Sequence, residues 1–95
     1  MNRATKSLVM AVLNHNSSEK NTVCCIEEMS ELIKVLTKKL RKSEKFSIEK
    51  LTEEISHVLL LCNVIAAEHG IREKDILKEQ MDAVQRMEEE DGVRR

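Results

Sequence analysis

The stretch Ile48–Gly70, "IEKLTEEISHVLLLCNVIAAEHG", decides the fold. Its apolar residues recur every three or four positions, which is the period of an α-helix rather than that of a strand. They are Ile48, Leu51, Ile55, Val58, Leu59, Cys62 and Ile65. Ser47 supplies a side chain that can cap the start, and Gly70 suits the left-handed conformation in which helices often end. The sequence therefore predicts one long helix between Ser47 and Gly70.

Three more segments show the same period. They are roughly residues 4–14, a segment from Glu19 or Asn21 to Arg41, and one that starts near Arg72 or Glu73. The chain has no Pro, Trp or Tyr, and Phe46 is its only aromatic residue, whereas β-sheets favour aromatic and β-branched strands joined by many turns. We therefore expect an all-α fold, a helical bundle of about four helices in a single domain spanning residues 1–95.

The core of such a chain is thin. Its 95 residues bury a modest fraction of their surface, and the apolar side chains are nearly all aliphatic. The long apolar rows of the second and third helices therefore have too little to pack against within one chain. We expect these helices to complete their core against a second copy, as a homodimer or homotetramer.

Charge and composition exclude several classes of partner. The formal net charge is −1 and the isoelectric point is about 6.3, so there is no basic field for a nucleic acid. The apolar run from Leu8 to Leu13 is too short for a membrane span or a signal peptide, which favours a cytoplasmic protein without a membrane partner. Three cysteines without CxxC spacing indicate neither a disulfide framework nor a zinc site. Cys24 and Cys62 are expected to pack as small apolar residues.

Two acidic motifs carry the chemistry, "EEMSE" at 27–31 and "EEISH" at 53–57. At helical spacing, Glu28 and Glu31 share a row with apolar neighbours on the second helix, and Glu54 does the same on the third, with His57 beside it. Carboxylates on packed rows are costly unless a cation compensates them. The two rows together could form an oxygen-rich site that suits Mg²⁺ or Mn²⁺.

An alternative interpretation makes these glutamates ordinary acids at the rim of the helices. They would then pair with lysines one turn away, at Lys34, Lys38 or Lys50. The residues alone leave both interpretations open.

The segments "CIEEMSELIKVLTK" and "LTEEISHVLLLCNVIAAEHGI" resemble the MazG-like all-α nucleotide pyrophosphohydrolases. The signature of that family is Glu-Glu-x-x-Glu on one helix and Glu-x-x-Asp on the next, and the resemblance covers roughly residues 20–90. It implies an oligomeric helical bundle that hydrolyses nucleoside triphosphates to the monophosphate and pyrophosphate, with Mg²⁺ held by four acids.

The resemblance implies a role for each matching position. Glu28, Glu31, Glu54 and His57 would be the metal ligands, although His57 stands where the family has Asp. Imidazole is a poorer ligand for Mg²⁺ and suits Mn²⁺, Fe²⁺ or Zn²⁺ better. Glu27 or Glu31 would orient the attacking water or accept its proton. The triphosphate would meet cationic side chains, for which the candidates are Lys34, Lys38, Lys78 and Arg86.

Two further interpretations differ in class. The first is a catalytically silent relative, a helical dimer that binds nucleotide or a protein partner. The second uses Glu54-x-x-His57, because Glu-x-x-His motifs also build di-iron sites in four-helix bundles. That arrangement would need a second subunit to supply the remaining ligands.

Overall fold

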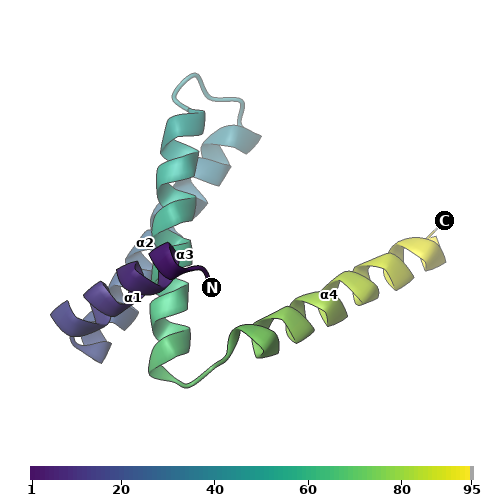
Figure 1. Cartoon of the computed structure of the whole chain (residues 1–95). Helices are drawn as coiled ribbons and strands as arrows, with labels where there is room; N and C mark the ends of the chain where they lie inside the picture. Colours follow the sequence, from purple (N-terminus) through teal and green to yellow (C-terminus); the bar gives the residue numbers. More distant parts are fainter. Residues whose placement is uncertain (95) are drawn as a thin grey trace.

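A computed structural model describes residues 1–94, which form four α-helices (Figure 1). They are α1 (Arg3–His15), α2 (Ser18–Leu40), α3 (Ile48–Glu68) and α4 (Glu73–Arg94). The described residues contain no strand, so the prediction of an all-α fold is confirmed. Among these helices, none has both the length and the apolar character needed to cross a bilayer.

Short polar side chains fix where the helices begin. The side chains of Asn2, Ser17 and Ser47 each accept a hydrogen bond from the backbone amide three residues further on, at 2.8–3.1 Å. This is the N-cap geometry that satisfies an otherwise unpaired helix amide. At the start of α4, the carboxylate of Asp75 instead reaches back to the backbone N–H of Arg72 at 3.1 Å.

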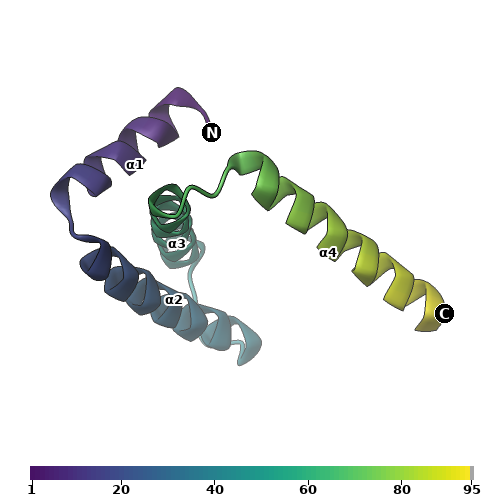
Figure 2. The same ribbon diagram turned by 90° about the horizontal axis from the view of Figure 1, so that it is seen from below.

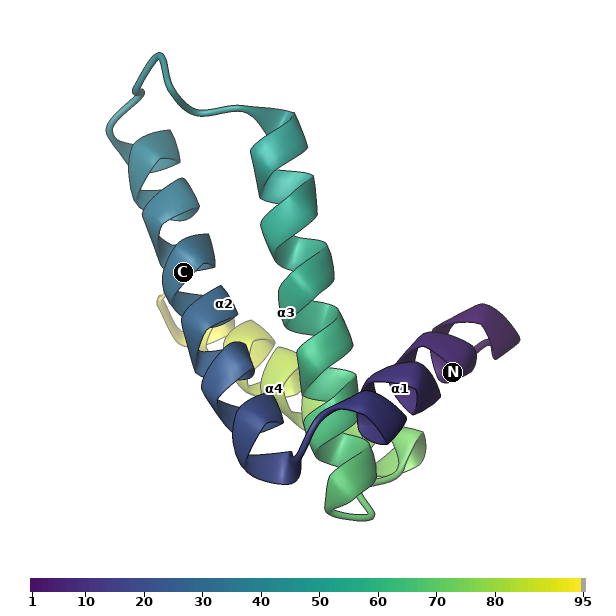
Figure 3. The same ribbon diagram turned by 90° about the vertical axis from the view of Figure 1, so that its left-hand side faces the viewer.

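The helices α2 and α3 form an antiparallel hairpin, which is the largest packing unit of the described chain (Figure 3). Its turn contains Lys42 in the left-handed conformation, with φ of 54°. The amides of Lys42 and Ser43 bond to the carbonyls of Lys39 and Lys38, at 3.1 and 3.0 Å, which is the Schellman arrangement. The chain therefore reverses at a residue that carries a Cβ, where glycine is the usual choice.

The buried core runs along the α2–α3 hairpin and includes the place where α1 crosses it. Its apolar members come from all three helices: Val9, Cys25, Val35, Leu61, Val64 and Ala66. Asn21 is 1% exposed at the same end of the hairpin and uses both ends of its amide. It accepts from Asn16 at 3.1 Å and donates to Glu68 at 3.3 Å, so the polar group is buried with its partners.

The helix α4 leaves this core instead of covering it (Figure 2). The turn before it is a second Schellman motif, in which Gly70 has φ of +65°. Ile71 and Gly70 donate to the carbonyls of Ala66 and Ala67 at 2.9 and 3.3 Å. Because α4 projects outward, the radius of gyration is 16.2 Å, compared with about 12.4 Å for a compact domain of this length.

The apolar row predicted for the second helix faces outward. Its members are 41–84% exposed: Ile26, Met29, Ile33, Leu36 and Leu40. The face of α2 that meets α3 carries Asn21, Cys25 and Val35, all below 9% exposed. The row of α2 that contains Glu28 therefore packs against α3, and the more apolar row of α2 stays exposed.

Candidate metal centre between α2 and α3

Glu54 is the buried acid of the molecule's hairpin. It is 3% exposed and lies on the face of α3 that meets α2, two turns before the buried Leu61. Its Oε1 pairs with Lys50 Nζ at 3.3 Å. Its Oε2 is buried and meets no hydrogen-bond partner among the described residues. An orphaned carboxylate oxygen of this kind is costly, and a bound cation is one way to compensate it.

His57 lies one turn further along α3 and bonds across to α2. Its Nδ1 lies 3.0 Å from Glu28 Oε2, and the two side chains are 45% and 28% exposed. A carboxylate accepts but cannot donate, so this contact assigns the proton to Nδ1 and leaves Nε2 free of it in the neutral ring. Glu28 thus orients the imidazole in the absence of an ion, and Nδ1 and Glu28 can share an ion only after Nδ1 gives up this proton.

Glu28, Glu54 and His57 converge from two helices. One ligand atom from each lies within 4.8 Å of the other two. Two carboxylates and one imidazole can share a divalent ion, and a nitrogen donor favours Mn²⁺, Fe²⁺ or Zn²⁺ over Mg²⁺. Together with the orphaned oxygen of Glu54, the donor set fits a metal ion.

The fourth predicted ligand, Glu31, lies outside this three-residue cluster. It is one turn beyond Glu28 on α2, and its Oε1 pairs with Lys34 Nζ at 3.1 Å. The side chains are 46% and 68% exposed, so the pair is solvated. This is the rim arrangement of the alternative interpretation. Glu54 also has a lysine partner, but its burial distinguishes it from a rim acid.

Lys50 bridges two acids of α3. It bonds to Glu53 Oε2 and Glu54 Oε1, both at 3.3 Å. The hydrogen bonds to Glu53 and then to Glu54 raise the pKa of the Lys50 ammonium. The signal for this contact was present in the sequence, because Lys50 precedes the two acids by three and four residues.

The remaining predicted residues are distributed along exposed faces. Glu27 and Lys38 are exposed on α2. On α4, Lys78 pairs with Asp82 at 3.6 Å, and Arg86 lines a shallow groove beside Met87. Since α4 runs away from the hairpin, neither of these two cations approaches the metal cluster of its own chain (Figures 1 and 2).

The cysteines of the described chain are free thiols, and their burial differs from the expectation. Cys25 is buried at 6% exposed, whereas Cys24 and Cys62 are partly exposed. The reason is the register of α2, which turns Cys25 toward α3. Burial first, and then the neighbouring Cys62, raise the pKa of the Cys25 thiol.

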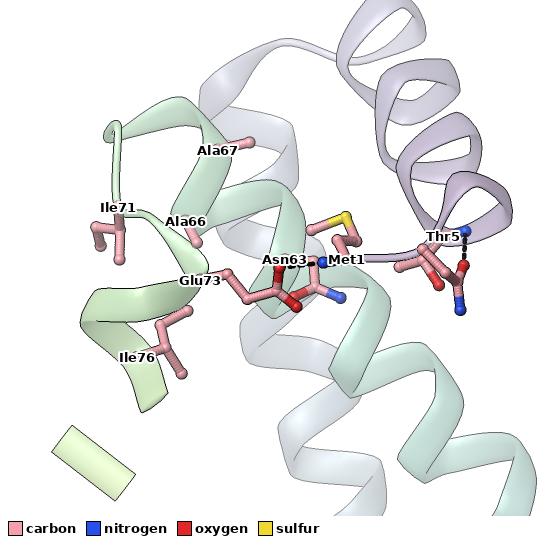
Figure 4. Close-up of a pocket in the computed structure, with 9 residues that line it drawn as sticks. Met1, Thr5, Asn63, Ala66, Ala67, Ile71, Glu73 and Ile76 are labelled. Atoms are coloured by element: carbon pink, nitrogen blue, oxygen red, sulfur yellow. Dashed lines mark hydrogen bonds and ion pairs between the residues drawn. The ribbon is translucent and has the colours of Figure 1, made fainter. Parts of the chain in front are cut away.

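A partly enclosed cavity lies elsewhere in the described part of the chain. It measures about 340 Å³ and lies at the junction of α1, the end of α3 and the start of α4 (Figure 4). Asn63, Ala66 and Ile76 line it, and at its edge the Met1 amino group pairs with Glu73. Asn63, the lining residue of α3 nearest to His57, is six residues after it, roughly 9 Å along the helix. The cavity is therefore separate from the metal cluster.

Comparison of the chain with protein-family models, curated proteins and solved structures finds no match. The resemblance to the MazG-like enzymes remains a prediction from the two acidic motifs. The convergence of Glu28, Glu54 and His57 is an independent, geometric observation.

Proposed function

We propose that this chain is a metal-dependent nucleoside triphosphate pyrophosphohydrolase of the MazG-like type, which converts a triphosphate to the monophosphate and pyrophosphate. The observation that supports this most is Glu54, a 3%-exposed carboxylate with an orphaned oxygen beside Glu28 and His57. A structural ion pair would have both oxygens satisfied, whereas a ligand awaiting a cation would not.

In this proposal Glu28, Glu54 and His57 hold the ion, which is Mn²⁺ or Mg²⁺. A divalent ion there would neutralise phosphate charge and lower the pKa of an attacking water. Glu31 lies one turn beyond Glu28 on α2 and would join the site if it exchanged Lys34 for the ion. Glu27 or Glu31 then orients the water and accepts its proton.

The cations of α2 bind the phosphates in this proposal. Lys34 and Lys38 lie one and two turns beyond Glu31 and can meet the negative oxygens that remain outside the metal's reach. Phosphoryl transfer of this kind requires positioning and charge stabilisation more than covalent chemistry from the protein. The enzyme acts in the cytoplasm as a homo-oligomer, in which the exposed apolar rows are covered.

A second candidate is a catalytically silent dimer that binds nucleotide or a protein partner. Two contacts favour it. The hydrogen bond between His57 and Glu28 and the pair between Lys50 and Glu54 compensate part of the acidic charge without any metal. A site that is already partly neutral has less need of an ion.

One screen separates these functions. The canonical and several modified nucleoside triphosphates are incubated with the protein and Mg²⁺, Mn²⁺ or Co²⁺, and pyrophosphate is assayed. We expect release with at least one metal, lost in Glu54→Gln and retained in the exposed control Glu53→Gln. Nucleotide binding without pyrophosphate would identify the silent dimer. Bound iron with absorbance in the near ultraviolet would identify a di-iron site instead.

A further inference from the structure

The chain exposes more surface than a compact monomer of its mass. Its accessible surface is 7,788 Å², whereas a folded monomer of 10.9 kDa exposes roughly 5,600 Å². The excess is therefore roughly 2,200 Å² for each chain. Obligate dimers bury about 2,000–5,000 Å² in total, so two chains carry enough uncovered surface for such an interface.

Much of this excess lies on two matching helix faces. On α4, four apolar side chains are 51–63% exposed: Leu77, Met81, Val84 and Met87. The outward row of α2 begins at Ile26 and ends at Leu40, which is 84% exposed. Leu77, Val84 and Met87 repeat the spacing of Ile26, Ile33 and Leu36, since both sets advance by seven and then three residues. The two rows can therefore interdigitate over several turns.

The α4 of one chain is held away from its own α2. The Schellman motif at Gly70 fixes the exit from α3. Asp75 then clamps Arg72 through its backbone N–H at 3.1 Å and its guanidinium at 3.2 and 3.3 Å. The start of α4 is also tied to α1 by the pair between Met1 and Glu73. Folding α4 back would require the Gly70 turn to change or the Met1–Glu73 pair to break.

The charges give the direction in which α4 lies on α2. The last turns of α4 are acidic, with Glu88 and Glu89, and the last turns of α2 are basic, with Lys38 and Lys39. A parallel arrangement places these opposite charges side by side. An antiparallel one would bring the acidic end of α4 to Glu27, where it is repelled.

We propose that α4 of each chain packs in parallel along the outward row of α2 in a second copy, so that two chains exchange their last helices. The matching register sets Ile33 against the partner's Val84 and Leu36 against the partner's Met87. This interface is inferred from surface and charge, and it stands whether or not the chain hydrolyses triphosphates.

Cross-linking between two different chains tests the pairing. Cys24, Cys25 and Cys62 are replaced by Ala, and one chain then receives Leu36→Cys while the other receives Met87→Cys. The two are mixed, allowed to exchange and oxidised, and the products are separated without reductant. We expect a covalent heterodimer, and much less of it when Leu77→Cys replaces Met87→Cys, because an antiparallel contact would favour that pair.

The other products would overturn the proposal. A chain that carries both Leu36→Cys and Met87→Cys and forms an internal disulfide while remaining monomeric shows that α4 folds back. A homodimer of Leu36→Cys chains alone shows that α2 pairs with α2. No cross-link in any mixture shows that the two faces do not meet.

Sedimentation of otherwise unmodified chains gives a second measurement. Val84→Asp should raise the dimer dissociation constant about 100-fold, because it places a charge in the apolar contact. Arg86 lies on the opposite face of α4, and Arg86→Asp changes the net charge by more than Val84→Asp does. It should nevertheless alter the dimer dissociation constant less than about threefold. Equal effects of the two substitutions, with helicity retained, would refute the contact.

Discussion

The replacement of Glu54 by Gln tests the proposed metal centre most directly, because it keeps the shape of the side chain and removes its charge. In the metal-free protein, one buried oxygen of Glu54 has no partner among the described residues, and burying a charged carboxylate costs more than burying a neutral amide of the same shape. Glu28 adds like-charge repulsion from across the hairpin. Loss of the Lys50 contact offsets part of the gain. We therefore expect Glu54→Gln to raise the free energy of unfolding by about 1 kcal/mol, or roughly 4–8 °C in Tm for a chain of this length.

The same substitution should weaken metal binding. A metal present at 100 times its Kd stabilises the native state by about 2.7 kcal/mol. If the loss of one carboxylate ligand raises the Kd about 100-fold, the same metal concentration stabilises the variant by only about 0.4 kcal/mol. Without metal, the variant should therefore have the higher free energy of unfolding, and added metal should raise that value only slightly. The parent protein should have the lower value without metal and should be stabilised much more when metal is added.

Thermal unfolding with and without Mn²⁺, at one fixed protein concentration, measures both effects. Glu53→Gln is the matched control, since Glu53 bonds to the same Lys50 at 3.3 Å but its side chain is 50% exposed. It should shift the free energy of unfolding by less than about 0.5 kcal/mol and leave the metal response unchanged. If Glu54→Gln instead destabilises the protein by more than about 1 kcal/mol and keeps its metal response, Glu54 is a structural partner of Lys50 and the reasoning is refuted.

Three further predictions concern single residues. His57→Asp should increase Mg²⁺ affinity, because a carboxylate is a better ligand for Mg²⁺ than an imidazole. Unchanged calorimetric titrations with Mg²⁺ would place His57 outside the site. Lys42→Gly should stabilise the protein by about 1 kcal/mol, because glycine adopts the left-handed backbone at φ 54° without strain. Lys42→Ala keeps the Cβ and should not stabilise it. Chemical denaturation of the two variants measures the difference. The Arg72 guanidinium, and then the backbone N–H of Arg72, lower the pKa of Asp75. The contact therefore stabilises the start of α4 fully at pH values above the ordinary aspartate pKa. This stabilisation is lost as the pH falls through the lowered pKa of Asp75. An NMR titration of the Arg72 amide should show that acid step in the parent protein and none in Asp75→Asn.

The sequence predicted the helices and most of the candidate site because both follow from local spacing. The three- and four-residue period marks α3 from Ile48 onward, and Gly70 ends it with φ of +65°, as a C-cap glycine should. The same spacing placed Glu28, Glu54 and His57 on rows that face one another. Helical geometry alone is enough for these inferences, since each residue's neighbours are one turn away.

The row by which α2 meets α3 could not be predicted in this way. Hydrophobicity favours burying the row from Ile26 to Leu40, but the structure buries the row that carries Asn21 and Glu28. Ranking rows by apolar content takes no account of surface that a second copy would cover. The direction of α4 could not be predicted from the sequence either. Gly70 indicates where α3 ends, but it does not indicate the direction in which the next helix runs.

The position of Glu31 depends on a competition that spacing leaves undecided. A glutamate on this row can turn toward the metal centre or toward the lysine one turn further on. In the structure it bonds to Lys34 at 3.1 Å. The two arrangements differ by the small free energy of a solvated ion pair, about 0–1 kcal/mol, so an ion or a substrate phosphate would be enough to change the outcome.

The buried amide of Asn21 has a consequence for the accuracy of the site. A slip of α2 by one turn, about 5.4 Å, would separate this side chain from Glu68 and leave a 1%-exposed polar group unpaired. The same slip would carry Glu28 away from His57. Alignment of the two acidic motifs is therefore enforced by a neutral amide seven residues from Glu28, where no ion takes part. The three side chains are therefore aligned without an ion, and the binding of a metal would not need to supply the free energy to bring the helices into line.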